Sequence, residues 1–323
     1  MDHAALAREV MRALRGTRSQ TAFSRRLGYR SNVAYAWESG RRYPTAAEMF
    51  RAAARTRIDV RAAVATFFHP RLPDALATLD PAKPAYAAAL LHALKGPAPM
   101  RVLAERTGLS RSAVSRLLTG ATQPRLPAFF QLVDAASRRL LDLLAGLVDV
   151  SALPAARDEW RRVETMRRLA VQNPLSESVP RFLELDQYAA LSKHRPGWIA
   201  ARLGITREEE DRTLRDLETA GVIRWDGARW RIDRERSIDT TRSDRRAAAF
   251  LRGHWSDQGA ARVRADRDGT FSYLVFTTDD ATLANLRALH LDYFRQVRAL
   301  VASSPRNTRV AVVNVQLFPI DDR

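Results

Sequence analysis

Residues 19–44 read SQTAFSRRLGYRSNVAYAWESGRRYP, and residues 99–124 read PMRVLAERTGLSRSAVSRLLTGATQP. When Gly28 is superposed on Gly108, further pairs align without a gap: Phe23 with Leu103, Ala34 with Val114, Trp37 with Leu117, Gly40 with Gly120 and Pro44 with Pro124. A repeat of this kind indicates one structural unit that occurs twice. The offset between the two copies is eighty residues.

The pattern within each copy predicts two short helices joined by a tight turn. In the first copy, a helix from about Ser19 to Leu27 ends at Gly28, where a residue with positive φ is expected. Ser31 is expected to be the N-cap of a second helix, which Gly40 ends. In the second copy Ser110 is the expected N-cap. This arrangement predicts a helix-turn-helix, whose second helix can enter the DNA major groove.

Amphipathic segments flank each copy and bring each unit to about five helices. They comprise residues 4–15, a segment that contains Met49 and Phe50, and residues 60–68 around the first copy, and residues 86–94, 129–133 and 140–148 around the second. The proline-rich stretch from Pro70 to Pro84 is expected to join the units. Two such units in one chain suggest a covalent pseudo-dimer on two half-sites about one helical turn, ~34 Å, apart.

Both copies resemble the lambda-repressor-like, or xenobiotic-response-element, DNA-binding domain. The first copy resembles it in Gln20, in the small Ser24 at the helix crossing and in the ending Trp37-Glu38-Ser39-Gly40-Arg41. The second copy departs from the pattern, because Met100 replaces the glutamine and Leu117-Leu118 replace Trp-Glu. The resemblance implies double-stranded DNA as the partner.

The candidate DNA contacts lie on the helix face opposite the expected core. Asn32 is the expected base reader, because an amide can bond an adenine edge in two places. Arginines on the second copy can bind guanine in the same bidentate way. Residues at helix ends would contact phosphates and position the protein. The full set is Gln20, Ser31, Asn32, Tyr35, Arg41, Arg42, Arg111, Ser112, Ser115 and Arg116.

The charge distribution favours a polyanionic partner for the first half of the chain. The 323 residues carry a net charge of +17, and 50 of the 53 basic residues are Arg. Residues 1–150 hold +12 of this charge, whereas residues 151–235 hold +1. A GC-rich genome would also raise the Arg content, but it would not make acids scarce in one half only. The local shortage of acids therefore indicates nucleic-acid binding.

A third helix-turn-helix is expected in residues 151–235, followed by a hairpin that turns at Asp226-Gly227, which together predict a winged helix. Its second helix begins Arg207-Glu208-Glu209-Glu210-Asp211, and these acids would be repelled by DNA. We therefore expect a structural or protein-contact role.

The sequence of residues 236–323 predicts a small α/β module. Strands are expected at 271–277 and 309–318, and a long helix is expected over 281–302, with an apolar stripe that packs on the sheet.

Residues 155–323 resemble a bacterial family of conserved hypothetical proteins that pair a helix-turn-helix with a domain of unknown function ending in Q-L-F-P. The motifs that carry this resemblance are Trp198 to Gly204 and Val315 to Ile320. The resemblance implies a transcriptional regulator, without a known ligand or reaction.

Other classes of protein are disfavoured by what the sequence lacks. It has no Cys, no phosphate-binding glycine-rich loop, no nucleophile elbow and no HExxH motif, and its six His are far apart. We expect neither an enzyme nor a metal or other cofactor. The absence of an apolar stretch long enough for a membrane span or a signal peptide predicts a cytoplasmic, nucleoid-associated protein with no membrane partner.

The sequence thus predicts a mainly α protein with four domains: helix-turn-helix units at 1–70 and 71–150, a linker helix and winged helix at 151–235, and an α/β dimerisation or sensing module at 236–323. The predicted function is a sequence-specific, double-stranded DNA-binding transcriptional regulator, acting as a repressor and a homodimer, with an effector or protein partner at its C-terminal half. One alternative is a protein-interaction scaffold or antitoxin-like partner with structural helix-turn-helix units. RNA binding is a second, although the aromatic strand motifs that stack unpaired bases are missing.

Overall fold

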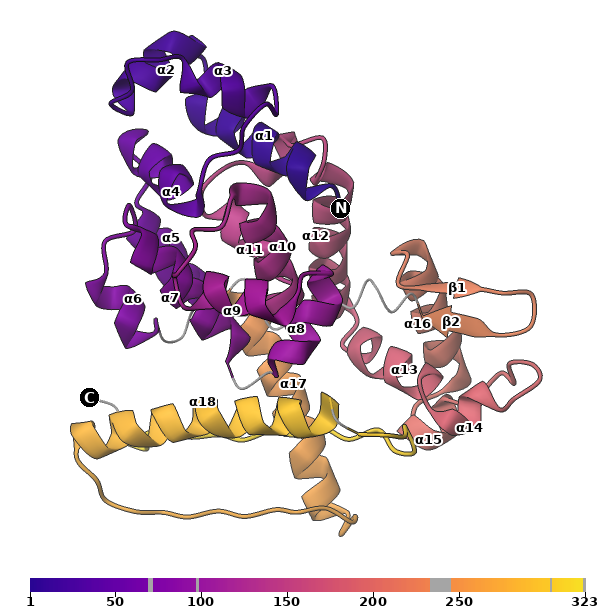
Figure 1. Cartoon of the computed structure of the whole chain (residues 1–323). Helices are drawn as coiled ribbons and strands as arrows, with labels where there is room; N and C mark the ends of the chain where they lie inside the picture. The colour runs from indigo at the N-terminus through magenta and orange to yellow at the C-terminus, as the bar shows by residue number, and fades with distance from the viewer. Residues whose placement is uncertain (69–71, 97–98, 233–244, 303, 322–323) are drawn as a thin grey trace. The chain divides into compact units, whose positions relative to one another are not determined.

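The computed structural model describes residues 1–68, 72–96, 99–232, 245–302 and 304–321. The protein is mainly helical, and it divides into two compact units, Met1–Arg161 and Arg162–Arg323 (Figure 1). Each unit is described below by itself. The predicted boundary at 235/236 lies outside the described residues.

The first unit contains two successive sets of five helices, with one additional short helix between them. The first set is α1 (His3–Arg15), α2 (Gln20–Arg26), α3 (Val33–Glu38), α4 (Ala46–Arg55) and α5 (Val60–Phe68). The second set is α7 (Pro84–Lys95), α8 (Met100–Thr107), α9 (Arg111–Leu118), α10 (Leu126–Ser137) and α11 (Leu140–Ala145). Between them lies α6 (Asp74–Thr78), and a 3-10 turn, η1 (Val150–Ala152), follows α11.

Helix ends in the two sets are formed by residues at equivalent positions. The glycines that follow the first three helices of each set have positive φ angles: Gly16, Gly28 and Gly40 in the first, and Gly96, Gly108 and Gly120 in the second. Each pair is separated by eighty residues. Positive φ is costly for residues with a Cβ atom, so these glycines let the chain reverse direction at the same three places in each set.

The stretch from Pro70 to Pro84 is more than the simple joint that we expected. It contains α6, and Leu76 on this helix is fully buried. The Arg61 guanidinium on α5 donates hydrogen bonds to the carbonyl oxygens of Ala77 and Leu79, at 2.6 and 2.8 Å. The segment therefore packs onto the first unit instead of separating its halves. A five-residue helix is too short to produce a periodic pattern that the sequence would reveal.

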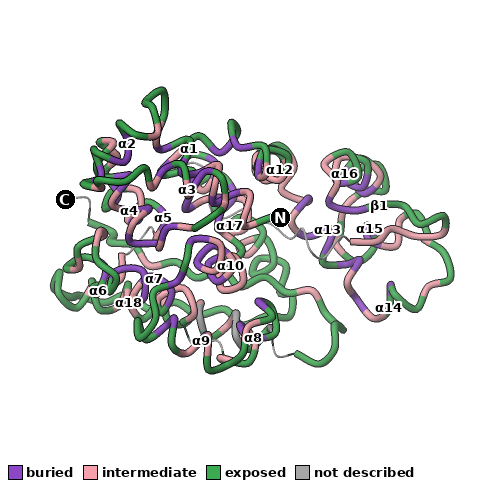
Figure 2. Tube along the Cα trace, turned by 45° about the horizontal axis from the view of Figure 1, so that its top comes forward, coloured by how far each residue is buried: buried purple, intermediate pink, exposed green. Residues whose placement is uncertain are grey.

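The two sets of helices share a single hydrophobic core. One continuous cluster of buried side chains extends from Leu6 to Ala156, and buried positions follow one another along α4, α7 and α10 (Figure 2). At its centre, the ring of Phe50 on α4 makes edge-to-face contacts with Tyr86 on α7 and Phe129 on α10, with centroids 5.6 and 5.9 Å apart. Both contacts join the first set to the second.

Reciprocal contacts relate the two sets by a local pseudo-two-fold axis. The amide of Leu126 donates to the carbonyl of Pro44 at 2.8 Å, and the amide of Ala46 donates to the carbonyl of Pro124 at 3.3 Å. Thr45 and Arg125 pair between them as an isolated antiparallel bridge. Helix α1 packs against α10 and its equivalent α7 packs against α4, while α5 meets α11. In an isologous interface, each contact from one copy to the other is matched by the reverse contact between the equivalent residues. The contacts between the two sets of helices are reciprocal in this way.

The second unit begins within α12 (Arg157–Gln172), which spans the boundary. It continues with α13 (Leu175–Leu183), α14 (Asp186–Ala189), α15 (Ala200–Leu203) and α16 (Arg207–Thr219). Strands β1 (Ile223–Trp225) and β2 (Trp230–Ile232) pair antiparallel, with Trp225 opposite Trp230, so the predicted hairpin is present. A second cluster of buried side chains, including Leu169, Val179, Ile199 and Leu217, holds these elements together.

The C-terminal segment differs from the predicted α/β module. Helices α17 (Arg245–Arg264) and α18 (Asp280–Ala302) are present, but residues 271–277 and 309–318 are extended without pairing as strands. Tyr273, Leu274 and Val275 are 95, 79 and 71% exposed, and Leu289 on the α18 stripe is 63% exposed. The stripe was expected to pack on a sheet. Because these two segments form no ladder, the described residues after α17 contain no sheet for it to cover.

Candidate nucleic-acid interface

Helices α2 and α3 are fixed against each other by one small polar side chain. The Ser24 hydroxyl on α2 accepts a hydrogen bond from the amide of Ala34 on α3 at 3.0 Å, and it lies 2.8 Å from the Gln20 carbonyl oxygen. Ser24 is 1% exposed. A larger side chain here would push the helices apart, which explains why a small residue stands at the crossing.

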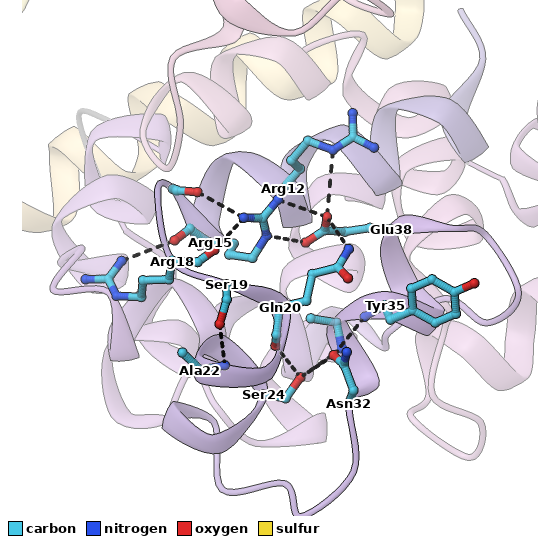
Figure 3. A network of polar contacts seen from close by, with 12 residues as sticks. Arg12, Arg15, Arg18, Ser19, Gln20, Ala22, Ser24, Asn32, Tyr35 and Glu38 are labelled. Atoms are coloured by element: carbon cyan, nitrogen blue, oxygen red, sulfur yellow. Dashed lines mark hydrogen bonds and ion pairs between the residues drawn. The ribbon is translucent and has the colours of Figure 1, made fainter.

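A buried carboxylate at the end of α3 connects three helices. Arg15 on α1 binds Glu38 through two parallel contacts, from Nε to Oε1 at 2.6 Å and from Nη2 to Oε2 at 3.1 Å. Gln20 at the start of α2 donates from Nε2 to Glu38 Oε2 at 3.0 Å, and Arg12 Nε lies 3.8 Å from the same oxygen (Figure 3). The Glu38 side chain is 4% exposed. Bidentate pairing of this kind is strong and sets the orientation of both groups.

This network changes what Gln20 can offer to a phosphate. Sequence reasoning placed Gln20 as a phosphate contact, but it did not identify Arg15 or Glu38 as its partners. One amide N–H of Gln20 is directed at Glu38, so the second N–H is the donor left for an outside ligand. The signal that could have revealed the network is the charge of Glu38 at a position where the second copy has the apolar Leu118.

Asn32, and not Ser31, is the N-cap of α3. Its Oδ1 accepts a hydrogen bond from the amide of Tyr35 at 3.2 Å, and it lies 3.3 Å from the Ser24 hydroxyl. A bidentate contact to adenine needs this oxygen as the acceptor. With the oxygen engaged in the cap, the free group of Asn32 is its amide donor. Asn and Ser are about equally good N-caps, which accounts for the error of one residue.

The remaining predicted contacts of the first copy lie on the surface. Ser31, Arg41 and Arg42 are exposed, and Tyr35 is 45% exposed. The Arg41 guanidinium lies over the Tyr35 ring, 5.1 Å from its centroid. Stacking of this kind holds a flexible arginine at the end of α3 while its donors stay available.

In the second copy, α9 presents two unpaired arginines. Ser110 caps the helix as predicted, by accepting from the amide of Ala113 at 3.2 Å, and its hydroxyl lies 3.0 Å from that of Ser112. Arg111 and Arg116 are exposed, and neither guanidinium has a hydrogen-bond or ion-pair partner among the described residues. Ser115 is half-buried between them. The predicted residues of α9 therefore lie on or near the surface.

Few negative charges accompany these helices. Residues 19–44 contain five Arg and one acid, and residues 99–124 contain four Arg and one acid. Both acids are already paired: Glu38 with Arg15, and Glu105 with Arg101 at 2.8 Å. Both segments therefore carry a net positive charge.

The acids that open α16 in the second unit have structural roles. Glu209 forms a capping box with Thr206, through bonds of 2.8 and 3.1 Å. Glu210 is fully buried, and its Oε2 accepts from the amide of Ala200 at 2.6 Å. Arg207 Nε lies 3.8 Å from Asp211 Oδ2. Three of the four acids are thus engaged within the unit.

Glu210 belongs to a buried group of titratable side chains. Its Oε1 lies 3.6 Å from Nε2 of His194, whose Nδ1 is 3.2 Å from the Tyr188 hydroxyl. Burial raises the pKa of Glu210, although bonds from backbone amides oppose the change, and burial lowers the pKa of His194. Burial also raises the pKa of Tyr188 to about 12. The group links α14, α16 and the hairpin, because the Trp230 amide donates to the Tyr188 hydroxyl at 3.2 Å.

Residues 158–320, half of the chain, match the family model described as Domain of unknown function (DUF4423). The chain belongs to this family. The DUF4423 match covers nearly the whole of the second unit, and it confirms that the C-terminal half is a domain of unknown function. Neither the curated proteins nor the solved structures contain a match to this chain.

In this DUF4423 protein, no three His, Asp or Glu side chains of the described segments lie close enough together to hold a metal ion. None of the helices in the same segments combines the length and apolar character that a membrane crossing requires.

Proposed function

We propose that α2–α3 and α8–α9 are helix-turn-helix units and that the protein is a sequence-specific, double-stranded DNA-binding transcriptional regulator, acting as a repressor. The observation that carries the proposal is the charge of the two helix pairs. Nine Arg stand against two acids, and both acids are neutralised by Arg. Such a surface attracts phosphates, while exposed side chains on α3 and α9 are available to base edges.

The two copies have different contributions in this proposal. In the first, Arg41, Arg42 and the second N–H of Gln20 bind the DNA backbone, and the Asn32 amide donor bonds a base acceptor. In the second, Arg111 and Arg116 bind guanine through its N7 and O6 atoms. The unpaired state of these two guanidinium groups supports the assignment, because no internal contact has to be broken before they bind DNA.

In the second unit, α15, α16 and the β1–β2 hairpin are proposed to form a winged helix that does not bind DNA. The exposed acids at the start of α16 disfavour contact with phosphates. A protein or effector is the expected partner of this half.

Selection of bound sequences from a random duplex library tests the function. We expect a defined motif, and an affinity that falls steeply with salt, because each neutralised phosphate releases counterions. Arg111→Ala and Arg116→Ala should each weaken binding to the selected duplex by about tenfold or more, since a bidentate arginine–guanine pair contributes about 1–3 kcal/mol of discrimination.

Other results would point elsewhere. No enriched motif together with a flat salt dependence would rule out specific DNA binding and favour a protein scaffold. Tighter binding to single-stranded RNA than to the duplex would favour the RNA alternative.

A further inference from the structure

We infer that a single chain binds one asymmetric DNA site, composed of two inverted half-sites of different sequence, in one fixed orientation. This inference rests on the proposed function and adds the form of the DNA ligand and the stoichiometry of the complex. It follows from the pseudo-two-fold contacts in the first unit and from the residues that occupy equivalent positions at α9 and at the start of α3.

The contacts fix the two helix pairs relative to each other. The bonds from Leu126 to Pro44 and from Ala46 to Pro124 cross the pseudo-two-fold axis in both directions. The side chain of Arg125 adds a bond from Nη1 to the Tyr43 carbonyl at 3.1 Å, and Arg139 Nη2 donates to the Phe67 carbonyl at 2.8 Å. With the shared core, these contacts make the pair a preassembled unit in which no second chain is required.

Short segments connect α3 and α9, the second helix of each pair, to the Thr45–Arg125 bridge on this axis. Thr45 lies seven positions after the end of α3 at Glu38, and Arg125 lies seven positions after the end of α9 at Leu118. Seven residues span at most about 25 Å, so neither helix end is farther than that from the axis. Two helices related in this way fit half-sites that are themselves related by a two-fold axis, which means inverted repeats about one turn of DNA apart.

The residues at equivalent positions are different in the two copies. Ser31, Asn32, Tyr35 and Ala36 in the first copy correspond to Arg111, Ser112, Ser115 and Arg116 in the second. The arginines of the second copy select guanines, whereas the first copy has no cation among its four residues. A perfectly palindromic site would therefore satisfy one copy and not the other.

The groups for phosphate contact are also unequal. Gln20, Arg41 and Arg42 in the first copy correspond to Met100, Ala121 and Thr122 in the second. Two cations and an amide donor thus anchor the first copy to the backbone, and the second copy depends more on base contacts. This inequality gives the bound chain a preferred direction on the DNA.

The test begins with the duplex that the wild-type full-length chain selects, whose halves are called A, for the first copy, and B, for the second. Binding is then measured to the inverted A–B duplex, to A–A and to B–B, and the mass of each complex is determined. We expect one chain per A–B duplex, with A–A and B–B bound about tenfold more weakly or worse, because each mismatched base pair costs about 1–3 kcal/mol.

A designed variant converts the second copy to the first. Arg111→Ser, Ser112→Asn, Ser115→Tyr and Arg116→Ala together give the second copy the residues that stand at the equivalent positions of the first, and the variant should prefer A–A to A–B. The control, Arg55→Ser with Lys83→Ser, also removes two exposed positive charges, but outside both helix pairs. It should retain the A–B preference. Thermal unfolding of all variants checks that the fold is intact, and the wild-type comparison does not depend on them.

The outcomes separate this inference from the function on which it rests. If no duplex is selected, the proposed DNA binding itself fails. If a duplex is selected but is palindromic, binds two chains, or is protected over one half-site only, DNA binding stands and the asymmetric single-chain complex is wrong.

Discussion

At the scale of single residues, Glu38 has the largest expected effect on the stability of the first helix pair. Its carboxylate is buried and accepts from both Arg15 and Gln20. Removal of one partner of a buried ion pair leaves the other charge without compensation. Glu38→Ala is therefore expected to lower the free energy of unfolding by about 3 kcal/mol, measured by urea denaturation.

The matched control for this change is Glu105→Ala in the second copy. The Glu105 pair with Arg101 is about 60% exposed on both sides, and exposed pairs contribute at most about 1 kcal/mol. Equal effects of the two substitutions would contradict a special role for Glu38. The double variant Arg15→Met/Glu38→Leu should lose less stability than Glu38→Ala, because no buried charge is left unpaired.

Asn32 allows helix capping to be separated from DNA contact. Asn32→Asp retains an acceptor for the Tyr35 amide and places a negative charge at a helix N-terminus, where it is favourable. The melting temperature should be unchanged, whereas DNA affinity should fall by tenfold or more, because the donor is lost and the charge repels phosphate. Asn32→Ala should instead lower the free energy of unfolding by about 1 kcal/mol through loss of the cap. Normal DNA binding by Asn32→Asp would exclude the Asn32 amide from the interface.

His194 and Glu210 are expected to give opposite pH dependences in the second unit. The folded state lowers the pKa of His194, so it holds fewer protons than the unfolded chain, and stability falls as pH drops through the ordinary His value of about 6.5. The folded state raises the pKa of Glu210, so its favourable contribution is present at low pH and is lost as pH rises through the folded pKa.

Chemical denaturation of the second unit between pH 5 and pH 7 measures both effects. His194→Gln should flatten the loss of stability on acidification, and Glu210→Gln should make the loss steeper. If both variants followed the wild-type curve, neither group would titrate differently in the folded and unfolded states.

At the scale of elements, the end of α11 approaches α5 closely at Gly146. A Cβ atom added to Gly146 would lie 2.9 Å from the Cβ of Ala63. The backbone of Gly146 is helical, with φ −74°, so the space and not the backbone limits substitution. Gly146→Ala should cost about 1–3 kcal/mol of stability, as overpacking does. The double variant with Ala63→Gly should recover part of this loss.

Gly253 on α17 provides the opposite case. Nothing lies within 4 Å of a Cβ atom added there, and the residue is inside a helix. Gly253→Ala should therefore stabilise α17 by about 0.5–1 kcal/mol. The two changes are chemically identical, and opposite signs in thermal unfolding would show that the close approach decides the effect at Gly146.

Local features of these elements were predictable from the sequence. Ser110 is the N-cap that the pattern indicates, the first of the two short helices begins next to Ser19 as expected, and Gly28, Gly40, Gly108 and Gly120 have positive φ. These features depend on residues within one turn of each other. The periodicity also identified inward-facing residues such as Phe50 and Phe129, but it does not say against which helix a buried face packs. The shared core and the Arg15–Glu38–Gln20 network were therefore missed.

The error in the C-terminal segment has the same origin. Apolar residues such as Tyr273 to Phe276 favour a strand by composition, but a strand needs a partner with which to form hydrogen bonds. In the described part of the chain these residues have no such partner, and they are extended and exposed. The β-propensity of such a run favours an extended backbone, but it does not determine which other segment the run pairs with.

At the scale of the whole molecule, the first unit should unfold in one step in spite of its internal repeat. Phe50 contacts side chains of the second copy, so Phe50→Ala is expected to cost about 3–5 kcal/mol and to loosen both copies. Hydrogen exchange should increase equally for amides of α3 and α9. An increase confined to α3 would show that the two copies are separate cooperative units.

Because of the shared core, the fraction of molecules in which the two helix pairs are joined does not depend on the concentration of the protein. When two helix pairs come from separate chains, the paired form is scarce at low concentration, because mass action makes its amount depend on the square of the chain concentration. Here, the bonds between Pro44 and Leu126 and between Pro124 and Ala46 join parts of one polypeptide. Every folded molecule therefore contains the complete pair, and a cell with only a few copies of the chain has as large a fraction in the paired form as a cell with thousands.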